Sequence, residues 1–118
     1  MAAYKDTLRS LALNDDHFVD SLLGLGRDNV DASGLDPKTH ALLLLAASMA
    51  IDAAPSSYQS IVEMAQATGA SFDEMVGCLI AVAPIVGSVR VVSAAPELAL
   101  ALGYDVEAAL QASDRDEA

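Results

Sequence analysis

One short segment carries most of the side chains in this chain that could do chemistry. It follows Pro55 and consists of five consecutive polar residues, Ser56, Ser57, Tyr58, Gln59 and Ser60. Hydroxyl and amide groups donate and accept hydrogen bonds, so the segment could line a pocket for a small ligand. The alternative is that the serines cap the first turn of a helix and the other side chains face solvent.

Arg90 is the second candidate, because it is the only basic residue between Lys38 and Arg115 and is flanked by valines. A guanidinium in apolar surroundings needs a partner, since an uncompensated buried charge is costly. That partner is either a substrate carboxylate, held by the forked donors of arginine, or an acid of the protein. The acids that we consider are Asp52, Glu63 and Glu97.

Two histidines have side chains that titrate near neutral pH when unperturbed, and they are His17 and His40. His40 falls in the first turn of a predicted helix, where it acts either as a general base or in a surface or capping role. His17 belongs to Asp15-Asp-His-Phe18, a run too short to surround an ion, so we expect no metal site and no cofactor. A hydrolase triad of Ser57, His40 and Asp52 lacks the G-x-S-x-G turn that would support it.

The single cysteine, Cys78, excludes an intramolecular disulfide and a C-x-x-C centre. It lies in the apolar stretch Met75 to Ile80. We therefore interpret it as an inert core thiol.

Composition predicts one all-α domain over residues 1–118. Hydrophobic residues make up 53% of the chain and aromatic residues 4%, and alanine, the best helix former, is abundant. The surplus of apolar residues predicts an oligomer. A net charge of −11 argues against nucleic acid and anionic membranes as partners. The longest apolar runs, about 11 and about 15 residues, are shorter than a membrane span. With no signal peptide evident, we expect a cytoplasmic protein.

The remaining signals predict a series of helices and their ends. Helices are expected over 2–13 and 15–25, followed by a polar loop over 27–33. Asp36-Pro37 and Pro55 begin the next two, which end near Ile51 and before Gly69. Ser71 and Glu74 form a capping box for a helix to about Ala83. Pro84 and Gly87 predict a break or a kink, and Pro96 predicts another helix boundary. The expected later helices are 89–95, one between Pro96 and Gly103, and one capped by Asp105.

Residues 35–103 resemble the carboxymuconolactone decarboxylase and alkylhydroperoxidase D-like family. The resemblance rests on Leu35-Asp-Pro-Lys-Thr-His40 before an apolar helix, on the turn Ala67-Thr-Gly-Ala-Ser71, and on Ala83-Pro-Ile-Val-Gly-Ser-Val-Arg90. It implies an all-α subunit that assembles into trimers or hexamers. In many members two cysteines, a histidine and an acid reduce peroxides. Their positions here fall on Ala54 and Ser57, on Ser60 or Ile61, and on Ala41 or Leu42, so we expect no dithiol chemistry.

Two functions follow from these residues and the resemblance. In the first, the chain is a cofactor-free lyase or isomerase that acts on a small carboxylate or a lactone. Arg90 then anchors the acid, Tyr58 and His40 handle protons, and hydrogen bonds come from Ser57, Gln59 and Ser60. In the second, the chain is a catalytically silent oligomeric scaffold or partner-binding subunit. A hydroperoxidase activity, as in the redox branch of the family, is the least expected.

Overall fold

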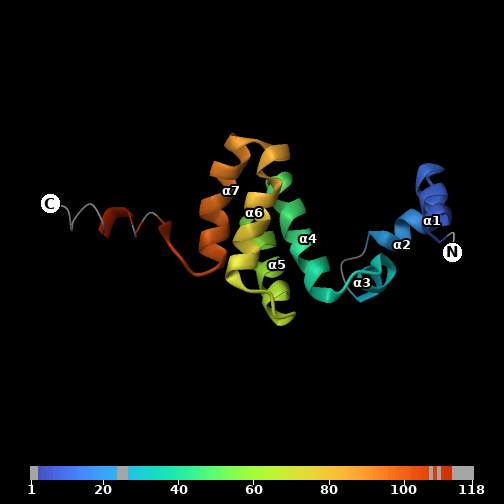
Figure 1. The fold of residues 1–118 in the computed structure, drawn as a ribbon, viewed down its shortest axis with the longest axis horizontal. Coiled ribbons are helices and arrows are strands. Elements are labelled where there is room, and N and C mark those ends of the chain that lie inside the picture. Colours follow the sequence, from blue (N-terminus) through green and yellow to red (C-terminus); the bar gives the residue numbers. More distant parts are fainter. Residues whose placement is uncertain (1–2, 24–26, 107, 109, 113–118) are drawn as a thin grey trace. The chain divides into compact units, whose positions relative to one another are not determined.

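The computed structural model describes residues 3–23, 27–106, 108 and 110–112. Within these residues the chain is helical and contains no strand (Figure 1). The chain divides into two compact units, residues 1–36 and 37–118, and each unit is described by itself. The predicted all-α fold is therefore confirmed, while a single domain over the whole chain stays a prediction.

The first unit contains α1 (Ala3–Ala12), α2 (Asp16–Leu22) and α3 (Arg27–Ser33). The two expected helices are present, but the polar loop predicted over 27–33 is wrong, because those residues form α3. A contact with α2 helps to hold this short polar helix, since Asn29 Nδ2 donates to the carbonyl oxygen of Leu22 at 2.8 Å. The predicted end of the second helix, at residue 25, lies outside the described residues.

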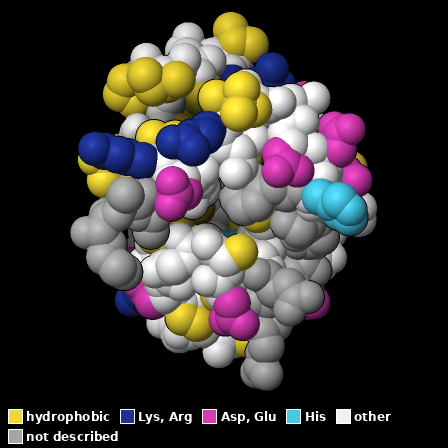
Figure 2. Space-filling view, turned by 90° about the vertical axis from the view of Figure 1, so that its right-hand side faces the viewer, with side chains coloured by type: hydrophobic (Ala, Val, Ile, Leu, Met, Phe, Trp, Pro, Cys, Tyr) yellow, Lys and Arg dark blue, Asp and Glu magenta, His cyan; other side chains and the backbone are white. Residues whose placement is uncertain are grey.

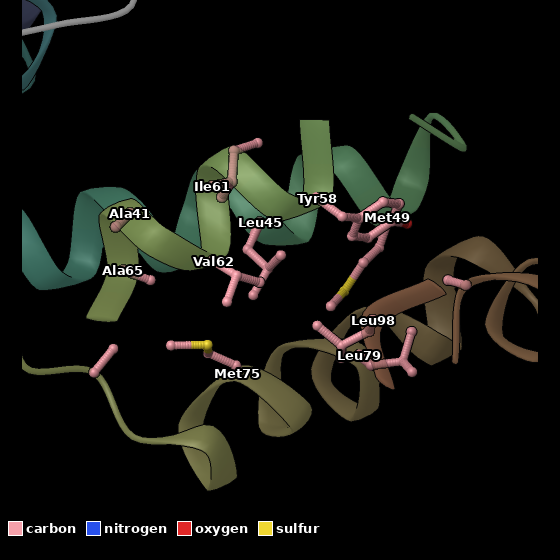
Figure 3. Close-up of a cluster of buried hydrophobic side chains, with 12 residues drawn as sticks. Ala41, Leu45, Met49, Tyr58, Ile61, Val62, Ala65, Met75, Leu79 and Leu98 are labelled. Atoms are coloured by element: carbon pink, nitrogen blue, oxygen red, sulfur yellow. The ribbon is translucent and has the colours of Figure 1, made fainter. Parts of the chain in front are cut away.

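The second unit is a bundle of four helices, α4 (Pro37–Ala50), α5 (Pro55–Ala67), α6 (Phe72–Val86) and α7 (Ser88–Ala101). The helices lie side by side in Figure 1, and α4 packs against each of the other three. Their apolar faces meet in one core, which Figure 3 shows as a row of side chains. The largest fully buried members are Tyr58, Leu45, Met49, Met75 and Val62.

Local signals set the helix ends in this unit as predicted. Ser71 Oγ accepts from the backbone N–H of Glu74 at 3.0 Å, and Glu74 Oε1 accepts from the N–H of Ser71 at 2.9 Å. This reciprocal pair is the expected capping box of α6. Gly69 follows α5 with a φ of +91°, a conformation that favours glycine. Asp105 Oδ1 accepts from the N–H of Ala108 at 3.1 Å, which is the predicted cap.

The break predicted from Pro84 and Gly87 lies at Gly87, which separates α6 from α7, whereas the break predicted at Pro96 is wrong. α6 continues through Pro84 to Val86, and α7 runs unbroken through Pro96, so the separate helices expected around Pro96 are one helix. A proline in a helix leaves the carbonyl four residues earlier without its usual donor. Those carbonyls belong to Ile80 and Val92, which are 70% and 72% exposed. Both residues therefore lie on the solvent-facing sides of their helices, where water can bond a carbonyl that lacks a donor and so lower the cost of a proline.

Many large apolar side chains of the second unit reach the surface. The central helix α4 exposes Leu43. From Met75 to Pro96 the only charged residue is Arg90, and this segment exposes Ile80, Ile85, Val89 and Val92. On the one face of the molecule that Figure 2 draws, hydrophobic side chains lie at the surface among charged ones. In the part of the chain that the structure describes, none of the helices has the length and apolarity to cross a membrane.

Candidate functional site

Tyr58 is the only member of the polar segment that enters the bundle. Pro55 begins α5 and turns the side chain of Tyr58 inward, so that its exposed fraction is 0%. Figure 3 shows the ring beside Met49, at one end of the core. The phenolic oxygen is buried and has no hydrogen-bond partner among the described residues. A buried hydroxyl without a partner costs free energy, so its presence here needs an explanation.

Arg90 pairs with an acid of the protein. Its Nη1 lies 3.3 Å from Oδ2 of Asp52, and the two side chains are 39% and 45% exposed. Arg90 lies in the first turn of α7, and Asp52 follows the last turn of α4. Of the three acids that the sequence left open as partners, Asp52 is therefore the one that meets Arg90.

Glu97 supplies a second buried oxygen atom. It lies on α7, seven residues after Arg90, and therefore on the same side of the helix. Its Oε2 is buried and, within the described part of the chain, has no hydrogen-bond partner. A carboxylate oxygen in this state can accept a hydrogen bond from any donor that reaches it.

Electrostatics link these residues into one site. The pKa of Tyr58 is raised above its ordinary value of 10.0, first by burial and then by the negative charges of Glu97 and Asp52. The positive charge of Arg90 lowers the pKa of Tyr58 and partly offsets these effects. We call these four residues, Tyr58, Glu97, Asp52 and Arg90, the Tyr58 cluster. It joins the start of α5, one side of α7 and the turn between α4 and α5. At neutral pH its phenol is protonated and can donate a hydrogen bond.

The other polar residues of the segment lie outside this cluster. Ser57, Gln59 and Ser60 are exposed on α5. Gln59 Nε2 donates to Oε1 of Glu63 at 3.3 Å, and Ser60 Oγ donates to the carbonyl oxygen of Ser56 at 3.1 Å. These contacts stay within one helix, so the alternative of an exposed polar face describes the segment better than a common pocket does.

His40 is not brought to Tyr58. The histidine is 5% exposed, so the surface position considered for it is wrong, and it lies in the first turns of α4. Tyr58 packs against Met49, near the other end of that helix. The rise of an α-helix places the ends of this interval roughly 14 Å apart. Figure 3 shows Ala41, the neighbour of His40 in the chain, and Tyr58 at opposite ends of the core.

Cys78 is half-buried on α6, and its thiol donates to the carbonyl oxygen of Leu42 at a sulfur–oxygen distance of 3.6 Å. Burial raises the pKa of the Cys78 thiol, and the carboxylate of Glu74 raises it further. The thiolate is the reactive form of cysteine, so both effects disfavour reactivity. Among the described residues, no three side chains of His, Cys, Asp or Glu come together as a metal site.

A groove of about 380 Å³ lies between α6 and α7, apart from the Tyr58 cluster. Its walls are almost entirely apolar and include Phe72, Val76, Leu98 and Tyr104. The groove has few polar groups that could transfer a proton, so it suits hydrophobic packing rather than acid–base chemistry.

The sequence identified Tyr58 and Arg90 but gave Glu97 no role except as an ion-pair partner. Arg90 and Glu97 are seven residues apart, a spacing that places both on one side of a continuous helix. The sequence did not predict a continuous helix there, because Pro96 indicated a break. Comparison of the chain with protein-family models, with curated proteins and with solved structures finds no match.

Proposed function

We propose that this chain is a thiol-free member of the carboxymuconolactone decarboxylase and alkylhydroperoxidase D-like family. In this proposal it binds a small carboxylate or a lactone and acts on it as a cofactor-free lyase or isomerase. The Tyr58 cluster is the site. One observation carries the proposal: the hydroxyl of Tyr58 is buried, has no hydrogen-bond partner among the residues described, and lies in the electrostatic field of Glu97, Asp52 and Arg90.

The chemistry of the cluster suits a proton shift next to a carbonyl group. Glu97 takes a proton from a carbon beside the substrate carbonyl, and the electron pair of that bond moves onto the carbonyl oxygen. Tyr58 donates a hydrogen bond to this oxygen as its negative charge develops. Return of the proton from Glu97 to another carbon of the conjugated system completes an isomerisation without any co-reactant.

Arg90 would orient the substrate by its carboxylate. A guanidinium offers two parallel N–H donors, which match the two oxygens of a carboxylate. The ion pair with Asp52 leaves Arg90 partly exposed and therefore accessible to a ligand. Ser57, Gln59, Ser60 and His40 have no role in this form of the proposal, because they lie outside the cluster.

The experiment is a thermal-shift screen of small carboxylates and lactones against the whole chain. A ligand that binds the native state raises the melting temperature. We expect at least one compound to do so, and we expect Tyr58→Phe and Arg90→Lys to reduce the shift. Tyr104→Phe is the matched control, because Tyr104 is 58% exposed and lies outside the cluster. A panel without any hit, or hits that survive both cluster variants, would contradict the proposal.

A second candidate function is the catalytically silent oligomeric scaffold. The observation that favours it is the Arg90–Asp52 pair, since an arginine already neutralised by the protein needs no ligand. The segment from Met75 to Pro96, which contains no acidic residue and exposes apolar side chains, also suits association, because two acidic chains repel each other least where they carry no acids. In either function we propose a homo-oligomer, as a trimer or a hexamer.

A further inference from the structure

Asp52 occupies a backbone position that disfavours it. It follows α4 with a φ of +57°, where its N–H donates to the carbonyl of Met49 and the next N–H, that of Ala53, donates to Ser48. The same hydrogen-bond pattern ends α1, α5 and α7, with Asn14, Gly69 and Gly103 at the corresponding position. Glycine and asparagine are the usual residues there. Asp52 is the one charged residue among the four.

The partial charges of the two helix ends also disfavour both Asp52 and Arg90. The carbonyl groups at the end of α4 carry partial negative charge and repel the carboxylate of Asp52. The N–H groups at the start of α7 carry partial positive charge and repel the guanidinium of Arg90. A half-exposed ion pair contributes little to stability, so the pair does not by itself account for an acid at position 52.

The contact also leaves much of the binding capacity of Arg90 unused. A single pair of atoms, Nη1 and Oδ2, meets at 3.3 Å, whereas a guanidinium can hold both oxygens of a carboxylate at once. Asp52 is 45% exposed, so on leaving Arg90 its carboxylate would enter water without crossing the core. An incoming carboxylate can therefore replace Asp52 at small cost.

We propose that Asp52 occupies the position on Arg90 at which a ligand carboxylate binds. A small monocarboxylate displaces Asp52 from Arg90 when it binds. Asp52 thereby determines the affinity and the charge preference of the site. The inference rests on the proposed function. It adds that the ligand class is a small monocarboxylate and that affinity is set by competition with an acid of the same chain.

The test is isothermal titration calorimetry with sodium acetate and sodium benzoate, at an ionic strength held constant with sodium chloride. The chains are the wild type, Asp52→Asn and Asp52→Gly. Both substitutions suit the backbone at position 52, as Asn14 and Gly103 show at the same position of other helices. We expect each substitution to lower the Kd by about fivefold, because the ligand no longer has to displace a half-exposed ion pair. Glu63→Gln is the control for net charge, since it removes an exposed carboxylate from α5.

The outcomes separate this inference from the proposed function. Tighter binding in the Asp52 variants that is lost when Arg90→Gln is added supports both. Binding to the wild type with the same Kd in the Asp52 variants, or a gain no larger than that of Glu63→Gln, overturns the inference and leaves the proposed function standing. Binding that persists with Arg90→Gln also overturns the inference. Absence of binding in all chains contradicts the proposed function and the inference together.

Discussion

The hydroxyl of Tyr58 and Oε2 of Glu97 are both buried, on helices α5 and α7, which pack together. Neither atom has a hydrogen-bond partner in the part of the chain that the structure describes. The carboxylate of Glu97 also raises the pKa of Tyr58. Native structures satisfy almost all of their buried polar atoms, so two such atoms in one electrostatic cluster are unusual. A ligand that accepts from Tyr58 and donates to Glu97 would satisfy both.

The substitution Tyr58→Phe tests whether the hydroxyl contributes to stability. Because it removes a buried polar group without a partner, we expect the free energy of unfolding to stay the same or rise by about 1 kcal/mol. Urea denaturation of both chains measures the difference. Tyr104→Phe, at an exposed tyrosine, should change nothing. A loss of more than about 1 kcal/mol in Tyr58→Phe would mean that the hydroxyl has a structural partner.

The raised pKa of Tyr58 predicts a loss of stability at alkaline pH. The folded chain keeps the phenolic proton at pH values where the unfolded chain, with its ordinary pKa of 10.0, releases it. The contribution of Tyr58 is therefore complete below pH 10.0 and is lost as the pH rises through the higher folded value. Unfolding free energies measured against pH should fall less steeply in Tyr58→Phe. Equal slopes in the two chains would contradict the raised pKa.

Glu97→Gln tests the electrostatic link within the cluster. Removing this negative charge should lower the pKa of Tyr58 toward its ordinary value, because Glu97 is the larger of the two charges that raise it. Spectrophotometric titration of tyrosinate, with Tyr58→Phe subtracted, follows this residue alone. Glu63→Gln serves as the control. A Tyr58 pKa that does not move in Glu97→Gln would show that the two groups are not coupled.

The sequence predicted the features of the fold that depend on neighbouring residues and missed those that depend on tertiary packing. The capping box of Ser71 and Glu74 and the turn at Gly69 depend on a few neighbouring residues, and both are confirmed. The continuation of α6 through Pro84 and of α7 through Pro96 was not predicted, because it depends on tertiary packing that leaves Ile80 and Val92 exposed. The polar residues of α3 predict a loop when they are considered alone. The contact of Asn29 with α2, which helps to hold the helix, is not visible in the local pattern.

The candidate site was predicted only in part. Tyr58 and Arg90 stood out by residue type, and Asp52 was among the acids considered for Arg90. His40 was grouped with them although the length of α4 separates it from Tyr58. The role of Glu97 follows from an unbroken α7, which the sequence did not predict.

Cys78 should react slowly with a thiol reagent such as 5,5′-dithiobis(2-nitrobenzoate). It is half-buried and its pKa is raised, so little thiolate is present at neutral pH. The unfolded chain in urea is the control and should react fast. We also expect no consumption of hydrogen peroxide by the wild type. Peroxide consumption that disappears in Cys78→Ser would instead make this residue a peroxidatic cysteine.

Val89→Glu tests the proposed oligomer. Val89 is exposed in the segment from Met75 to Pro96, which contains no acidic residue, and a carboxylate there would be desolvated in an interface. We expect sedimentation velocity to show a smaller species than the wild type, with unchanged helix content by circular dichroism. Gln66→Glu adds the same charge to an exposed position of α5 and should leave the assembly intact. A monomeric wild type would contradict the proposal directly.

The most direct test of the central claim is a binding titration of the wild type, Tyr58→Phe and Arg90→Lys with a panel of small carboxylates and lactones. The account predicts that at least one compound binds the wild type. It further predicts at least tenfold weaker binding in each variant, which corresponds to the loss of about 1.4 kcal/mol. Equal affinity in all three chains, or no binding by any of them, would contradict the claim that the Tyr58 cluster is a ligand site.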